Sequence, residues 1–156
     1  MDNCDKEFYT VRGYELLRQE NNPLTSSMED YLEMAYRLSK GKGYTRIGDL
    51  ANALNVQPPS VSKMVQKLAE LSYLKYEKYG LVELTEDGKQ IGYYLLNRHE
   101  TIEKFLRLIG VKNSILEETE KIEHSINKET LEQIRKLVKF MEKNKACREG
   151  FFNSNY

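Results

Sequence analysis

Both histidines of this chain stand beside acidic residues, a combination that can bind a divalent metal ion. Histidine is the commonest side-chain metal ligand, and carboxylates supply the oxygen atoms that hard divalent cations prefer. Glu120, Glu123 and His124 occupy positions i, i+3 and i+4, so a helix would present all three on one face. Asp30 and Glu33 repeat the three-residue spacing upstream. Because one such group is more often a solvated helix face, the metal hypothesis requires that the fold bring the groups together.

The composition indicates a helix-rich globular protein. Its 156 residues, 40% hydrophobic and 31% charged, suit one compact domain or two small ones. No apolar run approaches the roughly 20 residues of a membrane span, so we expect no membrane partner. Cys4 and Cys147 form no Cys-x-x-Cys unit, which favours a reducing cytoplasm and two free thiols. The 24 basic and 24 acidic residues balance, which argues against bulk attraction to nucleic acid, although residues 44–80 carry a slight basic excess.

The first carboxylate pair falls in a predicted helix. Ser27 with Asp30 forms a capping signal, and apolar residues at helical spacing continue to Leu38, before Gly41 ends the pattern. Residues 1–24 are predicted to be an arm with a short helix around 14–18, and the polar tail 145–156 is predicted to be loose.

The stretch that follows predicts a winged helix-turn-helix. Apolar residues at helical spacing mark one short helix over 47–54 and a second that begins near Pro59, with a four-residue turn between them. Residues 73–84 alternate aromatic and apolar positions around Lys78-Tyr79-Gly80, the pattern of a β-hairpin or wing. An ordinary helical hairpin is the alternative. Polar side chains outside the buried face favour DNA contact, and the candidate residues are Thr45, Arg46, Gln57, Pro58, Pro59, Ser60, Ser62, Lys63, Gln66, Lys67, Lys78 and Tyr79.

The second half of the chain predicts only helices. Thr85 caps a long helix that carries His99 and runs to about Ile109, where Gly110 ends it. Ser114 opens the helix with the second acidic group, and Asn127 caps a last one. The expected fold class is therefore mostly α: a winged helix at 25–85, then an all-helical domain at 86–144, to which the family resemblance described next assigns metal binding and dimerisation.

These segments together resemble a known family. SMEDYLEMAYRL, NVQPPSVSKMVQKL, YLKYEKYGLVELTEDGKQIG, NRHETIEKFLRLIGV and ETEKIEHSI are similar to the manganese-dependent branch of the diphtheria toxin repressor family. The likeness covers about residues 24–144, and the metal-ligand positions of that branch are filled by Asp30, Glu33, His99, Glu120, Glu123 and His124.

The resemblance implies a cytoplasmic metal-dependent repressor that is not an enzyme. It implies a binuclear centre, with Glu33 and Glu120 as candidates to bridge two Mn²⁺ ions, and a homodimer on a pseudopalindromic DNA operator that controls metal-uptake genes. Oxygen and imidazole ligands suit Mn²⁺, and Fe²⁺, Co²⁺ or Cd²⁺ could occupy the same ligands. No small organic ligand is expected.

Three other interpretations stay open. An iron-responsive member of the family would have the same architecture. A winged-helix regulator without a metal would leave the acidic residues solvated. A two-metal hydrolase would use the carboxylates for catalysis, but it leaves the winged helix unexplained, and neither His-Glu-x-x-His nor His-x-x-Glu-His occurs in the chain.

Overall fold

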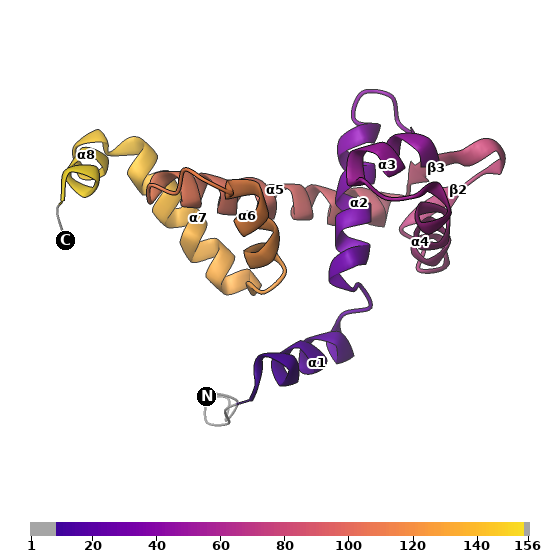
Figure 1. Cartoon of the computed structure of the whole chain (residues 1–156), viewed down its shortest axis with the longest axis horizontal. Helices are drawn as coiled ribbons and strands as arrows, with labels where there is room; N and C mark the ends of the chain where they lie inside the picture. Colours follow the sequence, from indigo (N-terminus) through magenta and orange to yellow (C-terminus); the bar gives the residue numbers. More distant parts are fainter. Residues whose placement is uncertain (1–8, 155–156) are drawn as a thin grey trace.

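One long helix, α5 (Glu86–Leu108), connects two groups of elements in the computed structural model, which describes residues 9–154 (Figure 1). The elements before it are α1 (Val11–Asn21), α2 (Ser26–Ser39), β1 (Thr45–Arg46), α3 (Ile47–Leu54), α4 (Pro58–Glu70), β2 (Leu74–Tyr76), a 3-10 turn at Lys78–Gly80, and β3 (Leu81–Leu84). The elements after it are α6 (Ile115–Glu123), α7 (Lys128–Lys143) and α8 (Lys145–Asn153). The predicted mostly helical class is confirmed.

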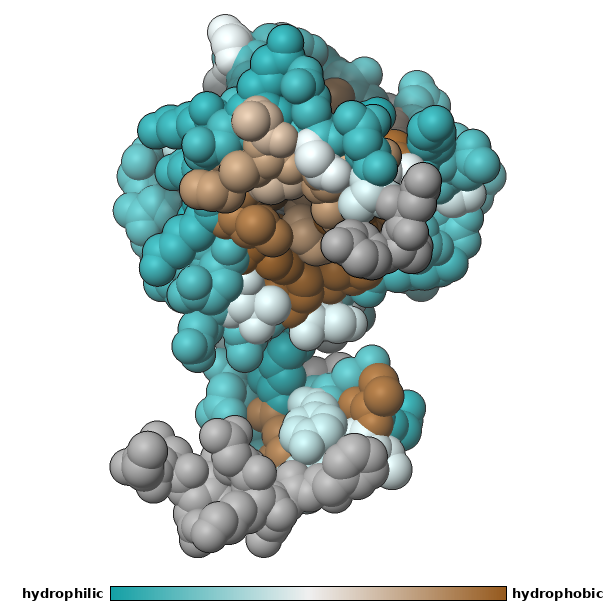
Figure 2. Space-filling view, turned by 90° about the vertical axis from the view of Figure 1, so that its left-hand side faces the viewer, coloured by the Kyte–Doolittle hydropathy of each residue, from teal (hydrophilic) through white to brown (hydrophobic). Residues whose placement is uncertain are grey.

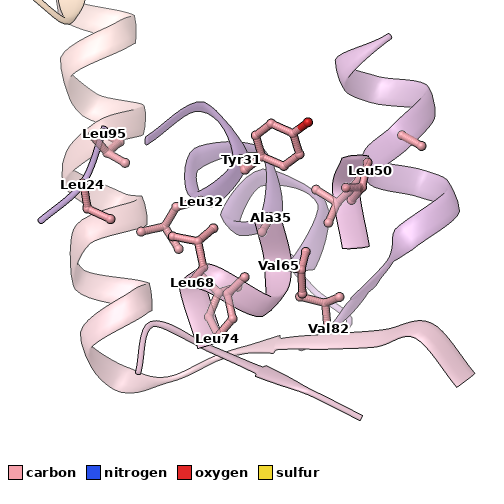
Figure 3. Packing of buried hydrophobic residues seen from close by; sticks show 13 residues of the cluster. Leu24, Tyr31, Leu32, Ala35, Leu50, Val65, Leu68, Leu74, Val82 and Leu95 are labelled. Atoms are coloured by element: carbon pink, nitrogen blue, oxygen red, sulfur yellow. The ribbon is translucent and has the colours of Figure 1, made fainter. Parts of the chain in front are cut away.

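The elements from α2 to β3 pack as a winged helix around one apolar core (Figure 3). Leu32, Leu50, Val65 and Leu68 are fully buried where α2, α3 and α4 meet. In α4 the fully buried Val61, Val65 and Leu68 lie four and three residues apart, because the helix buries one stripe of its surface. Leu74 and Val82 close the core from the side of the wing.

Backbone conformation fixes the turn between α3 and α4. Asn55 adopts a left-handed conformation with φ of 54°, which suits asparagine and ends α3. Pro58 occupies the first turn of α4, where its missing N–H leaves no helical hydrogen bond unmade. The predicted helix-turn-helix is thus confirmed, and its second helix begins one residue earlier than predicted.

The wing is part of a three-stranded antiparallel sheet with strand order β1-β3-β2. Leu74 pairs with Leu84 and Tyr76 with Val82, which confirms the predicted hairpin. The third strand, β1, was not predicted because two residues are too few to show an alternating pattern. At the wing tip Tyr79 has a φ of 73° and is 93% exposed.

Helix α5 belongs to both groups of elements. The side chain of Thr85 caps its start by accepting a hydrogen bond from the backbone N–H of Gly88, as predicted. Gly92 lets α2 cross α5 closely, because a Cβ there would lie 2.6 Å from the Cβ of Tyr36. Farther along, Ile102 and Leu106 form a second core with Leu131 of α7.

Three helices differ from the prediction: the start of α2, the length of α1 and the presence of α8. Thr25, and not Ser27, caps α2, because its side chain accepts a hydrogen bond from the N–H of Met28. Helix α1 is longer than the short helix predicted around 14–18. Residues 145–153 form α8 where a loose tail was predicted, since Phe151 and Phe152 give that polar segment an apolar side. None of the helices in residues 9–154 is long and apolar enough to cross a membrane.

Candidate metal centre and DNA-reading surface

The carboxylates of α2 meet the acidic end of α6 where the two groups of elements touch. Asp30 and Glu33 lie one turn apart on α2, and Glu123 and His124 lie at the end of α6. His124 Nε2 is 2.8 Å from Asp30 Oδ1, although the two residues are 94 positions apart in the chain. The convergence that the metal hypothesis required is therefore present.

Helix α5 adds the second histidine to this cluster. His99 is buried, and its Nδ1 lies 3.3 Å from Glu123 Oε2 and 3.4 Å from Glu120 Oε1. The same nitrogen is 4.0 Å from Glu33 Oε1. The alternative for His99, a core histidine held by ordinary hydrogen bonds, does not account for three carboxylates around one ring nitrogen.

The six side chains form two overlapping groups of possible metal ligands. In each group the ligand atoms lie within 4.8 Å of one another. One group contains Asp30, Glu120, Glu123 and His124, and the other contains Glu33, His99 and Glu123. Glu123 is the member that both groups share, whereas the resemblance implied Glu33 and Glu120 as bridging residues.

Two buried ligand atoms are paired only with the histidines of the cluster. Asp30 Oδ1 lies 2.8 Å from His124 Nε2 and Glu123 Oε2 lies 3.3 Å from His99 Nδ1, and no other group among the described residues donates a hydrogen bond to either oxygen. Without the histidine protons these buried oxygens would lack a partner, which is costly, and a bound cation would remove that cost. A cleft of about 400 Å³ between α2, α3, α5 and α6 connects this cluster with solvent.

The electrostatics of the cluster hold both histidines in their charged form. Burial lowers the pKa of His99, but hydrogen bonds to the two carboxylates of α6 outweigh it and raise the pKa to about 10. Burial also lowers the pKa of His124, and hydrogen bonds to Asp30 and Glu29 raise it to about 9. Burial raises the pKa of Glu123. The protein thus balances its own negative charge with two imidazolium protons.

The sequence did not single out three charged residues that lie beside the cluster. Arg37 forms an ion pair with Glu33 one turn away on α2. Arg98 and Glu29 form a buried ion pair of 2.6 Å between α5 and α2. The sequence held weak signals of both pairs: Glu33 lies four residues before Arg37, and Arg98 directly precedes a histidine.

Most of the residues predicted to contact DNA are exposed to solvent. The residues that are exposed are Arg46, Gln57, Pro58, Pro59, Ser60, Lys63, Gln66, Lys67 and Tyr79. Ser62 is half-buried. The prediction for Thr45 is wrong, because its side chain is fully buried under the pairing of β1 with β3. Lys78 lies outside the side chains that the structure describes.

A separate apolar surface covers the far end of the molecule from α4 (Figure 2). A cavity of about 240 Å³ there is lined by the end of α5 and by α7 and α8. Leu137, Phe140 and Phe151 are each about half exposed beside it. A contiguous apolar surface of this kind usually marks a protein interface.

Comparisons with known proteins match both halves of the chain. The family model for the iron dependent repressor N-terminal DNA binding domain matches residues 23–82. The model for the iron dependent repressor metal binding and dimerisation domain matches residues 85–150. These segments include the helix-turn-helix, all of the wing except its last two residues, and all six residues of the metal cluster.

Individual proteins that the chain is similar to are also transcriptional regulators. The HTH-type transcriptional regulator MntR of Geobacillus thermodenitrificans (strain NG80-2) is 47% identical over 83% of this chain and 92% of its own length. MntR of Bacillus subtilis (strain 168) is 49% identical over 78% of this chain and 87% of its own. The solved structure of the manganese regulator SloR has a TM-score of 0.65 and 29% identity, over 75% of this chain. The chain spans about half of the SloR chain, 55%.

Proposed function

The chain belongs to the iron dependent repressor family, and from this we propose that it is a metal-dependent, DNA-binding transcriptional repressor that responds to Mn²⁺. One observation carries the proposal. Ligand residues of the DNA-reading module (α2 to β3) and of the dimerisation helices (α5 and those after it) meet at one seam, the contact between α2, α5 and α6. We test it by measuring DNA affinity at buffered free Mn²⁺ and Fe²⁺ in parallel.

The proposed ligands are the six side chains of the cluster, which would hold two ions, and Glu123 belongs to both groups of ligands. All of them offer oxygen or imidazole nitrogen, a donor set that suits Mn²⁺ better than sulfur ligands would. Fe²⁺, Co²⁺ and Cd²⁺ remain possible substitutes. The MntR relatives and the manganese regulator SloR support the manganese response over the iron response.

The seam supplies a physical mechanism for the switch. Asp30 and Glu33 belong to α2 in the DNA-reading part of the chain, whereas Glu120, Glu123 and His124 lie on α6 and at its end. Divalent cations held by these residues would supply the positive charge that lets the carboxylates stay close together. The ligands would then restrict how each winged helix is oriented relative to the dimer axis.

DNA selects one of these orientations, because the two recognition helices of a dimer must lie about 34 Å apart, one turn of the duplex. Restricting the ensemble to that spacing is a population shift, and the coupling free energy in such systems is about 1–3 kcal/mol.

The partners follow from the division of the chain into domains. We propose an N-terminal arm at 1–24, a DNA-binding domain at 25–85, a helical metal-binding and dimerisation domain at 86–144, and a C-terminal tail at 145–156 that contains α8 (Lys145–Asn153). The apolar surface of α5, α7 and α8 is proposed as the homodimer interface. The protein acts on a palindromic DNA operator in the cytoplasm and is a regulator rather than an enzyme.

Lys63 is expected to bind a phosphate of the DNA backbone. It is exposed on the second turn of α4, the recognition helix. Lys63→Ala should lower affinity for all duplexes alike and reduce the slope of log affinity against log salt by about one. Lys136→Ala, an exposed lysine of α7, should leave that slope unchanged. An unchanged slope for Lys63→Ala would remove it from the phosphate-contacting residues.

Metal binding is expected to release protons. With pKa values of about 10 for His99 and about 9 for His124, both imidazoles are protonated at neutral pH. A ring nitrogen must lose its proton to bind a metal, so about two protons should leave, and affinity should rise with pH until about pH 10, the pKa of the more basic histidine.

Calorimetry of Mn²⁺ binding in two buffers of different ionisation enthalpy counts the protons released. Titration of Mn²⁺ into each buffer without protein is the control. A binding enthalpy that is the same in both buffers would show that the histidines are not ligands.

A further inference from the structure

Glu29 is a buried carboxylate beside the metal centre that has no place among the six proposed ligands. It lies on the first turn of α2, directly before Asp30. Its partners lie across the seam: Arg98 Nη2 of α5 is 2.6 Å from Glu29 Oε2, and His124 Nδ1 is 2.9 Å from the same oxygen. These contacts join positions that are 69 and 95 residues apart in the chain.

The contacts fix the direction of the hydrogen bond between Glu29 and His124. Because Glu29 is paired with the guanidinium of Arg98, its Oε2 is a charged acceptor. A ring nitrogen at 2.9 Å from that oxygen must carry a hydrogen and donate it. Arg98 Nη2, at 3.3 Å from His124 Nδ1, donates to the same carboxylate. The opposite ring nitrogen, Nε2, then points at Asp30 Oδ1.

Resting on the proposed metal centre, we propose that Glu29 is a positioning residue for His124. It holds the hydrogen on Nδ1 and fixes the rotation of the ring, so that Nε2 is the nitrogen presented to the metal. Arg98, which is buried with it, keeps Glu29 charged and in place. Histidine ligands commonly donate their second N–H to such a carboxylate, and loss of that partner lowers metal affinity about 10- to 100-fold.

The same contact links the two modules through protein side chains alone. Glu29 belongs to the DNA-reading module, whereas Arg98 and His124 belong to the helices that carry the rest of the cluster. The side chains of Glu29 and Arg98 are only 6% and 5% exposed, so water competes little for the ion pair. His124, the ligand at the end of α6, is therefore oriented by Glu29 of α2, and His124 in turn helps to fix the position of α2.

His99 can be compared with His124, because the opposite nitrogen of its ring faces the metal cluster. Its Nδ1 faces the carboxylates of the cluster, and its Nε2 faces Glu103 at 3.7 Å. Glu103 is partly exposed and pairs with Arg107. The two histidines should therefore bind metal through opposite ring nitrogens, His99 through Nδ1 and His124 through Nε2.

Nuclear magnetic resonance of the full chain with ¹⁵N-labelled histidine, loaded with diamagnetic ¹¹³Cd²⁺, tests the proposal directly. We expect cadmium coupling at Nε2 of His124 together with a hydrogen on its Nδ1, and coupling at Nδ1 of His99. Coupling at His124 Nδ1 would overturn the role of Glu29 while leaving the metal centre intact. If neither histidine couples to cadmium, the proposed metal centre fails, and the role of Glu29 fails with it.

Glu29→Gln supplies the second measurement. The glutamine keeps the volume but loses the charge that orders Arg98 and His124. We expect Mn²⁺ affinity, read from the paramagnetic resonance of free Mn²⁺, to fall about 10- to 100-fold. Glu86→Gln, which removes an exposed carboxylate of α5, should change nothing. Unchanged Mn²⁺ affinity in a folded Glu29→Gln protein would overturn the proposal, and the spectrum of the unaltered chain decides it if the variant does not fold.

Discussion

Glu123→Gln is expected to abolish Mn²⁺-dependent DNA binding and to weaken Mn²⁺ binding by at least about 100-fold, or roughly 3 kcal/mol. Glu123 is fully buried and is the residue common to both groups of possible ligands. Glutamine has almost the same shape but offers one neutral oxygen in place of a carboxylate, so both ions would lose charge compensation. Mn²⁺ affinity by paramagnetic resonance and DNA affinity by anisotropy measure the two effects.

The variant should still fold. Burial raises the pKa of Glu123, so a neutral side chain at this position removes an electrostatic cost in the protein without metal. Its thermal unfolding without metal should therefore be as cooperative as that of the unaltered chain. Glu117→Gln is the matched control, since Glu117 lies on the same helix but is exposed and paired with Lys121. Normal Mn²⁺-dependent DNA binding by Glu123→Gln would show that the metal centre has been placed wrongly.

Leu137→Asp is expected to produce a monomer with little affinity for DNA. Leu137 is 48% exposed and lines the apolar cavity at the end of α5, α7 and α8. A charge in the centre of an apolar interface would be buried without a partner, which costs several kcal/mol. A monomer contacts one half-site only, so we expect DNA affinity to fall by about 100-fold or more, since half of the base contacts are lost.

Analytical ultracentrifugation and DNA titration measure the two consequences separately. Lys139→Asp, which places the same aspartate on the polar side of α7, should leave the dimer intact. A dimeric Leu137→Asp protein would show that the subunits associate through another surface. A monomer with full DNA affinity would instead contradict the need for two half-sites.

The sequence predicted the ligands because their spacing is local, and it missed what depends on packing. Glu120, Glu123 and His124 share a face by helical geometry alone, so their grouping needed no structure. That Asp30 would lie against His124 depends on how α2 crosses α5, which Gly92 permits and no local pattern encodes. The family resemblance, rather than periodicity, supplied that step.

The errors have similar physical causes. Thr45 is polar and lies next to the helix-turn-helix, so it was placed among the DNA-contacting residues, but strand pairing buries it. Glu29 was overlooked because a single glutamate at the start of a helix is usually solvent-exposed. Its partner Arg98 is 69 residues away, and an ion pair across that separation leaves no periodic signal. Helix α8 was missed because its apolar residues contribute to a surface rather than to a core.

The coupling between metal and DNA is the central claim, and one thermodynamic cycle tests it. Palindromic duplexes are selected from a random pool in two separate selections, one with Mn²⁺ and one with chelator. A selected duplex is then titrated with protein at buffered concentrations of free Mn²⁺. Mn²⁺ affinity is measured in turn with and without that duplex. We predict that Mn²⁺ raises DNA affinity about 5- to 150-fold and that DNA raises Mn²⁺ affinity by the same factor. Equal DNA affinity in chelator and in saturating Mn²⁺ would contradict the account.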